Sequence, residues 1–229
     1  MPKLKPAIQQ ARREHILGAA ERCFARTGFH RTTMQDICRQ AGVSPGALYV
    51  YFNSKEALIA GIAERDRAEF AERLAGVADS PDFLAALKEL GEHYFVREAR
   101  PSHLMCIEIG LESTRNPRIA EIHRGVDEFV NSSFEKLFLR LKDEGHIAPD
   151  LPIPVVVQLF SVIADGMFWR RAVDPAFDGS VLVPATFDLM IGLLKPVLPR
   201  EPGAPPQVRT DTPRPDTEMT ANQRDGHRS

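Results

Sequence analysis

The chain has few of the features that mark several large classes of protein. Its 229 residues include only three cysteines and a single tryptophan, and no uninterrupted apolar run reaches the length of about 18 residues that a membrane helix needs. The cysteines are odd in number and widely spaced, which argues against a disulfide framework and a zinc site and suits a reducing cytoplasm. No apolar segment follows the polar start, so we expect no secretory signal, no membrane association and a cytoplasmic location.

Motifs typical of enzymes are also missing. The sequence has no phosphate loop, nucleophile elbow, HExxH motif, CxxC pair or dinucleotide fingerprint. Glu108 and Glu112 could share a helix face, but such carboxylate pairs are usually just solvated. His93, His103 and His123 are too scattered to suggest a metal site. We therefore expect no enzyme, no catalytic residue, no cofactor and no bound metal.

Charge is distributed unevenly along the chain, although the net charge is only −2. Residues 1–60 contain nine Lys and Arg against four Asp and Glu, whereas residues 61–200 contain sixteen against twenty-two. A basic first quarter on an acidic remainder favours a polyanionic partner for the first part alone. Chance clustering of charge is the alternative.

The first 60 residues show the pattern of several short amphipathic helices. Apolar residues at i, i+3, i+4, i+7 and i+8 from Ile16 to Phe24 predict a helix that Gly28 ends. A second run from Met34 to Ala41 begins after Thr33, an N-cap candidate, and ends at Gly42. Each run presents one apolar face, so we expect these helices to pack on one another.

A tight turn joins the second predicted helix to a third. Ser44 is a good N-cap, and Pro45 is tolerated at the first helical position because its missing N–H would have no partner there. The third segment covers Gly46–Phe52, and Asn53 or Ser54 caps a long fourth helix. Short helices joined by a turn that contains glycine predict a helix-turn-helix.

The rest of the chain continues with helical periodicity up to about residue 198. We expect helices from Phe83 to near Arg100 and over 104–114, 117–144, 155–173 and 183–197. The last 31 residues, 199–229, contain six prolines and no aromatic residue. Because such a segment buries too little apolar surface to offset its ordering entropy, we expect a disordered tail.

The N-terminal motif resembles the DNA-binding domain of TetR-family transcriptional regulators. The resemblance rests on Thr32-Thr33, Ile37 and the run from Ala41 to Leu58, which includes Tyr-x-Tyr-Phe-x-Ser-Lys-Glu-x-Leu, and it covers about residues 10–60. It implies an all-α fold, with a three-helix DNA-binding domain over 8–56, a helical effector-binding and dimerisation domain over 57–198 and the tail over 199–229.

The resemblance also implies which residues contact DNA: Thr33, Ser44, Pro45, Gly46, Ala47, Tyr49, Tyr51 and Lys55. The small side chains of Gly46 and Ala47 let the backbone approach base edges and thymine methyl groups. The hydroxyls of the tyrosines and the ammonium of Lys55 suit phosphate oxygens. The alternatives are that the tyrosines pack against the fourth helix and that Lys55 is only solvated. Lys3 and Lys5, with Arg12 and Arg13, are either an arm on the DNA or a solvated terminus.

The remainder of the chain resembles, more weakly, the choline-regulator-type branch of the family, in Cys106–Gly125 and Asp165–Arg170. This resemblance does not extend to the choline ligand. Pocket candidates are apolar or aromatic residues and one carboxylate, namely Met105, Phe129, Phe134, Asp165, Phe168 and Trp169. Aromatic stripes at helical spacing more often form a core than a pocket.

Asp165 is unusual because it lies within an otherwise apolar helix. A carboxylate in that position needs a partner. It could bind a cationic ligand, pair with Arg170 or Arg171 within the chain or across a dimer, or face solvent. Pairing within protein is the first interpretation, because buried charges are usually paired.

The two last predicted helices are the most apolar in the chain. Two such helices would bury their faces against a second pair, which predicts a two-fold homodimer through a four-helix bundle. Such a dimer would place two recognition helices about 34–36 Å apart, one turn of DNA, on a palindromic operator.

These observations lead to one principal hypothesis and two alternatives. The principal hypothesis is a repressor that binds double-stranded DNA as a homodimer and is released by a small apolar or amphipathic effector. An enzyme that mimics the N-terminal motif is one alternative, and a DNA-binding adaptor that responds to no effector is the other. A ligand that raises the melting temperature would favour the repressor over the adaptor.

Overall fold

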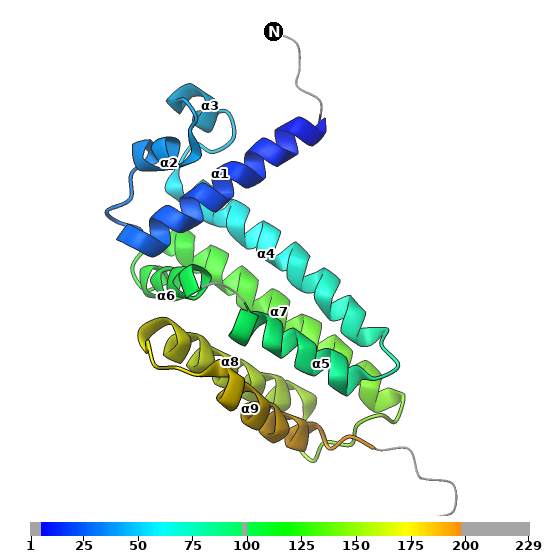
Figure 1. Ribbon diagram of the computed structural model, residues 1–229. Helices are drawn as coiled ribbons and strands as arrows, with labels where there is room; N and C mark the ends of the chain where they lie inside the picture. The colour runs from blue at the N-terminus through cyan, green and yellow to red at the C-terminus, as the bar shows by residue number, and fades with distance from the viewer. Residues whose placement is uncertain (1–5, 98–99, 198–229) are drawn as a thin grey trace, which may run out of the picture. The chain divides into compact units, whose positions relative to one another are not determined.

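The computed structural model describes residues 6–97 and 100–197, and this part of the chain is built from helices (Figure 1). The elements are α1 (Pro6–Thr27), α2 (Met34–Ala41), α3 (Pro45–Tyr49), α4 (Lys55–Ala78), α5 (Phe83–Glu92), a π-helical turn η1 (His93–Arg97), α6 (Arg100–Ser113), α7 (Pro117–Asp143), α8 (Ile153–Val173) and α9 (Gly179–Leu194). The predicted all-α fold is confirmed. The predicted tail, Lys3 and Lys5 lie outside the described residues.

One hydrophobic core holds the first four helices together, and we call this part the head. Ile16, Phe24, Ile37, Leu48 and Leu58 are all at most 1% exposed and belong to one hydrophobic cluster. These residues come from α1, α2, α3 and the start of α4. The apolar periodicity of the sequence therefore places the expected residues inside, and the short helices α2 and α3 are held by the longer ones.

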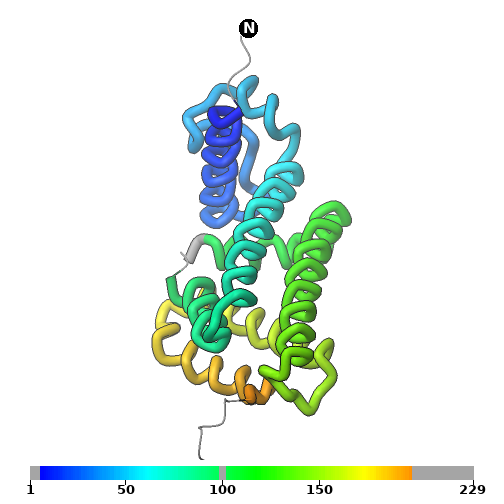
Figure 2. Tube along the Cα trace, turned by 90° about the vertical axis from the view of Figure 1, so that its right-hand side faces the viewer, coloured from blue at the N-terminus to red at the C-terminus, as the bar shows by residue number. Residues whose placement is uncertain are grey.

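A second core lies further along the chain, and we call this part the body. Aromatic and aliphatic side chains of α4, α5, α7, α8 and α9 form it, including Phe70, Leu87, Phe138, Phe160 and Phe187. Helix α4 contributes to both cores, because its first turns pack in the head and its last turns in the body. Figure 2 shows α4 running alongside α7 for much of its length.

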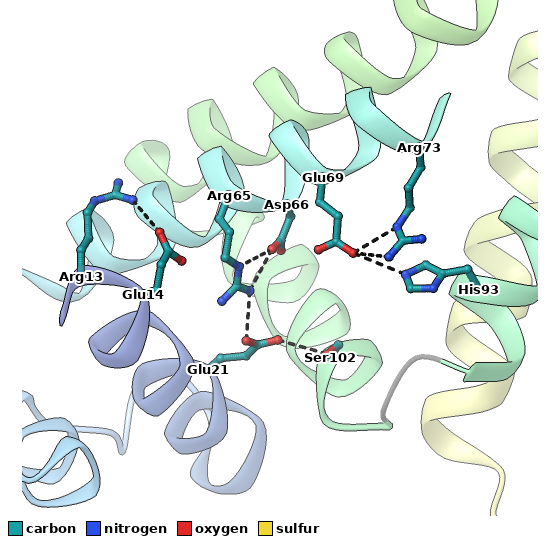
Figure 3. A network of polar contacts seen from close by, with 9 residues as sticks. All are labelled: Arg13, Glu14, Glu21, Arg65, Asp66, Glu69, Arg73, His93 and Ser102. Carbon is teal, nitrogen blue, oxygen red and sulfur yellow. Dashed lines mark hydrogen bonds and ion pairs between the residues drawn. The ribbon is translucent and has the colours of Figure 1, made fainter. Parts of the chain in front are cut away.

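Polar contacts tie α4 to its neighbours between the two cores (Figure 3). The Glu21 carboxylate of α1 accepts hydrogen bonds from Arg65 of α4 and from Ser102 of α6, each at 3.1 Å. Farther along α4, Glu69 pairs with Arg73 and with His93 of η1. Glu21 therefore joins α1 to both α4 and α6.

Several helix boundaries differ from those that the sequence predicts. The helix predicted from Phe83 to near Arg100 instead ends at Glu92 and passes into the π-helical turn, and α6 begins at Arg100 rather than 104. Helix α9 begins at Gly179 rather than 183, because Asp178 caps it and Pro184 is accommodated inside the helix. It ends at Leu194, where Lys195 takes a left-handed conformation.

Helix α8 is the one helix in the described residues that is long and apolar enough to cross a membrane. Length and composition alone are weak evidence, because helices that pack on other helices meet the same test. Here α8 packs against α6, α7 and α9.

Candidate nucleic-acid interface

The N-terminus of α2 is fixed by a complete capping box. The Thr33 side chain accepts a hydrogen bond from the backbone N–H of Asp36, and the Asp36 carboxylate accepts one from the Thr33 N–H. Hydrogen bonds from Thr33 hold the pKa of the Asp36 carboxyl below its usual value. Thr33 is exposed, whereas neighbouring Thr32 is buried and bonds to carbonyl oxygens of α1 and the following turn. Only Thr33 is therefore placed to reach a ligand.

The turn between α2 and α3 has the conformation that its sequence predicts. Gly42 has φ of 62°, a left-handed conformation that favours glycine, and its N–H bonds to carbonyls at the end of α2. The Ser44 side chain accepts a hydrogen bond from the Ala47 N–H, and Pro45 occupies the first turn of α3. The N-terminus of α3 is therefore fixed locally, with Ser44, Pro45 and Gly46 exposed.

Gly46 has no structural reason to be glycine within this chain. A side chain there would meet nothing within 4 Å, and its backbone does not need positive φ. Ala47, which follows, is partly exposed. The exposed start of α3 thus carries small residues that the fold itself does not require, which fits close approach by an external surface.

Side chains at the end of α3 differ in exposure. Tyr49 is 52% exposed, whereas Tyr51 is partly buried against the head core. Between them, Val50 is 80% exposed, the largest value among the exposed apolar residues of the described chain. Val50 was not among the contact residues predicted from the sequence. Its position was a usable signal, because Val50 lies two residues after buried Leu48 at the end of α3, which turns it to the opposite side of the helix.

Lys55 opens α4 and contacts the turn between α1 and α2. Its ammonium donates to the carbonyl oxygen of Phe29 and lies 4.2 Å from the centre of the Phe29 ring. Burial lowers the pKa of Lys55. The predicted phosphate-binding lysine therefore also holds the α1–α2 turn, a role that depends on contacts 26 residues apart in sequence.

The same turn is held from its other side by α6. The Phe29 N–H donates to Glu108 at 2.7 Å, and His30 pairs with Glu112 at 2.7 Å. Gly28 has φ of 77°, and a side chain there would strike the Glu108 carboxylate. The two carboxylates that the sequence suggested were merely solvated thus bind the head, and Glu112 is buried.

The six pocket candidates do not come together in one place. Phe129 and Phe134 pack on Phe70 in the body core, with ring centres 6.3 and 5.6 Å from its centre. Met105 lies in the head core. Phe168 packs against buried His103 of α6 with the two rings tilted by 41°, and Trp169 is 51% exposed.

Asp165 is exposed in the single chain, and its electrostatic neighbours His123 and Asp127 lie on α7. His123 of α7 pairs with Asp127 at 3.1 Å, and both of these groups act electrostatically on Asp165. Burial raises the pKa of Asp165, and the hydrogen bond to Asp127 raises the pKa of His123. Arg171 bonds instead to the carbonyl oxygen of Val96. In the described residues, no group of three or more His, Cys, Asp or Glu is arranged to hold a metal.

Helices α8 and α9 expose a broad apolar surface, which we call the α8–α9 face. Its members are Val155, Leu159, Val162, Trp169 and Val173 on α8, and Val181, Leu182 and Leu189 on α9. On α8 they recur at helical spacing along the full length of the helix. An exposed apolar surface of this extent is typical of an interface between proteins.

The chain is similar to known regulators in sequence. The family described as "Bacterial regulatory proteins, tetR family" matches residues 16–62. The chain is 33% identical over 172 residues to the HTH-type transcriptional regulator UidR of Escherichia coli strain K12, which covers 68% of this chain and 82% of UidR. It is 28% identical over 177 residues to the HTH-type transcriptional repressor Rv1474c of Mycobacterium tuberculosis, covering 75% and 88% of the two chains.

The fold is also similar to solved structures. Salmonella enterica GusR is 30% identical, superposes with a TM-score of 0.66 and is covered over 99% of its length, against 84% of this chain. The similarity to these relatives covers the head, with its capped helix α3, and most of the body. The chain belongs to the TetR family of bacterial transcriptional regulators.

Proposed function

We propose that this regulator is a repressor that binds a palindromic operator as a homodimer and leaves it when a small apolar or amphipathic effector binds. In this proposal residues 8–56 bind DNA, residues 57–198 dimerise and bind the effector, and residues 199–229 form a tail. Relatives named as repressors support the direction of regulation.

The exposed N-terminal end of α3 is the observation that carries the proposal. Gly46 and Ala47 leave room for the backbone to approach base edges, and thymine methyl groups could pack on Ala47, Pro45 and Val50. Thr33, Ser44, Tyr49, Tyr51 and Lys55 supply hydroxyl groups and a charge for phosphate oxygens. Sequence recognition would then depend largely on apolar contact and DNA shape.

The α8–α9 face supports dimerisation. Val162 is 68% exposed in the single chain, and burial of a whole row of such side chains is strongly favourable. A second copy offers the same face, so a two-fold four-helix bundle would cover both surfaces at once. Trp169 then belongs to the dimer interface rather than to a pocket.

The effector would bind among the partly buried aromatic residues of the body, of which Phe129, Phe134 and Phe168 are the remaining candidates. Helix α6 contacts α7 and α8, which carry these residues, and it also contacts α1 of the head. Ligand binding that displaces α6 would move Glu108, which holds the Phe29 N–H. An effector shifts the regulator only if it binds the two arrangements unequally.

Selection of genomic fragments by the purified protein, followed by footprinting, tests the proposal. Recovery of a palindrome is expected, with protection on one face of the duplex over two half-sites one turn apart. Retention of DNA without sequence preference would favour an adaptor instead. No retention at modest salt would contradict the proposal.

A further inference from the structure

The head carries exposed arginines that the proposed recognition contacts do not use. Arg22 and Arg26 lie one helical turn apart on α1, and Arg39 lies on α2. All three are exposed, and all three act electrostatically on the thiol of Cys23, which lies between α1 and α2. We call these three residues the arginine patch.

The patch keeps most of its charge available. Within the described part of the chain, neither Arg22 nor Arg26 makes an ion pair. Arg26 donates to the Gln40 side chain at 3.3 Å, which places its guanidinium over the end of α2. Arg39 pairs with Asp36, whose carboxylate is also engaged by Thr33. Of the three guanidinium groups, only that of Arg39 is paired with a carboxylate in the described residues.

The patch is continuous with the start of the recognition helix. A surface hollow of about 260 Å³ is lined by Arg26, Asp36, Arg39 and Gln40. A second hollow, of about 410 Å³, lies between α2 and α3 and is lined by Gln35, Cys38, Arg39, Gly42, Val43 and Pro45. Arg39 borders both hollows, so the hollow that Arg26 of α1 lines adjoins, across α2, the hollow that reaches Pro45 at the start of α3.

We propose that the arginine patch binds the DNA phosphate backbone on the side of α2 away from α3, and so extends the interface beyond the recognition helix. The inference rests on the proposed DNA binding. Guanidinium groups match phosphate oxygens in shape and charge, and continuity with the α3 surface places them beside a duplex. An acidic body of a second regulator is the other anionic surface that the patch could meet.

The test uses the operator recovered by fragment selection and the double variant R22Q/R26Q. Glutamine keeps helix propensity and removes charge, so the variant should fold, which circular dichroism checks. The control is R124Q/K136Q, which removes the same charge from exposed positions on α7. Affinity is measured over a range of salt, and phosphates whose ethylation blocks binding are mapped for each protein.

For the wild type, ethylation at one or more phosphates beside each half-site should block binding. In R22Q/R26Q, ethylation of the same phosphates should no longer affect binding. Removal of four charges per dimer should lower the salt slope by about 2–4 and weaken binding at low salt by about tenfold or more. The control should keep the wild-type map and nearly all of the slope.

An unchanged phosphate map in R22Q/R26Q would overturn the inference, even if affinity falls. Equal losses in the control would overturn it too, because the effect would then be that of net charge. A wild-type complex with two dimers on one operator, reduced to one dimer in the variant, would assign the patch to protein contact instead. Failure of the wild type to bind any operator would be a failure of the proposed function.

Discussion

The head and the body of this regulator bury their apolar residues to different degrees. In the head, large side chains such as Leu17, Phe24 and Leu48 are almost wholly enclosed. In the body, inward aromatics such as Phe129 and Phe134 stay partly exposed, and α8 and α9 leave an apolar face uncovered. The difference teaches that the head core is closed within one chain, with Met105 and Ile109 of α6 and Ile119 of α7 contributing to it, whereas we expect the body to be completed by a second chain and by a ligand.

Substitution within the α8–α9 face should have the largest effect, because it tests directly whether a second chain completes the body. V162E places a charge in the centre of the proposed dimer interface, where it would have no partner. We expect a monomer, and a loss of operator affinity of about 100-fold or more because the two half-sites would be bound separately. Sedimentation velocity and gel-shift titration measure the two effects.

The matched control is L139E, which charges an exposed apolar position on α7 outside that face. It should remain a dimer with wild-type affinity. A dimeric V162E protein would show that the α8–α9 face does not hold the two chains together.

A bulky residue on α3 should weaken DNA binding by the head without changing dimerisation by the body. A47L fills the space through which α3 would approach the bases, so operator affinity should fall by about tenfold or more, or the preferred sequence should change. Dimerisation and folding should be unaffected. The control is A68L, which adds the same bulk at an exposed position of α4. Operator binding by A47L with wild-type affinity and preference would show that α3 is not part of the DNA interface.

Substitution of Lys55 should have a smaller effect with two parts. K55Q should lower the salt slope of operator binding by about one for each phosphate that the ammonium neutralises in the wild type. It should also lower the free energy of unfolding by about 1 kcal/mol, because the Phe29 carbonyl loses its donor. A loss of stability with an unchanged salt slope would restrict Lys55 to holding the turn.

The smallest effect concerns the pH dependence of the body. Because Asp127 raises the pKa of His123 above its usual 6.5, the protonated imidazole stabilises the fold below pH 6.5, and this contribution is lost as pH rises through the raised value. The His123 side chain is 38% exposed, so the contribution is small. H123Q should reduce the fall in melting temperature between pH 6 and 8 by at most about 2 °C, and an increased fall would contradict this assignment.

Local signals in the sequence predicted the head well. Thr33, Gly42 and Ser44 act on backbone groups within four residues, so their roles follow from the sequence. The sequence offers two N-cap candidates for α4, Asn53 and Ser54. In the structure Ser54 is the N-cap, because its side chain accepts a hydrogen bond from the Ala57 N–H. At the start of α3, Ser44, Pro45 and Gly46 are exposed and Ala47 is partly exposed, and their contact with DNA stays a prediction.

Contacts between distant parts of the chain could not be predicted in this way. The binding of Phe29 by Glu108 joins residues 79 apart, and nothing in either local pattern indicates it. The placement of Asp165 beside His123 and the separation of Met105 from Phe129 likewise depend on how long helices pack. For the same reason the effector remains defined by its chemical class alone.

The spacing of the two half-sites tests the account most directly, because it depends on the recognition helices and the dimer together. Binding should be measured on the recovered palindrome and on a version with half a turn, about five base pairs, inserted at its centre. A rigid two-fold dimer predicts that the insertion reduces affinity to nearly that of one half-site. Equal affinity for both duplexes would contradict the account.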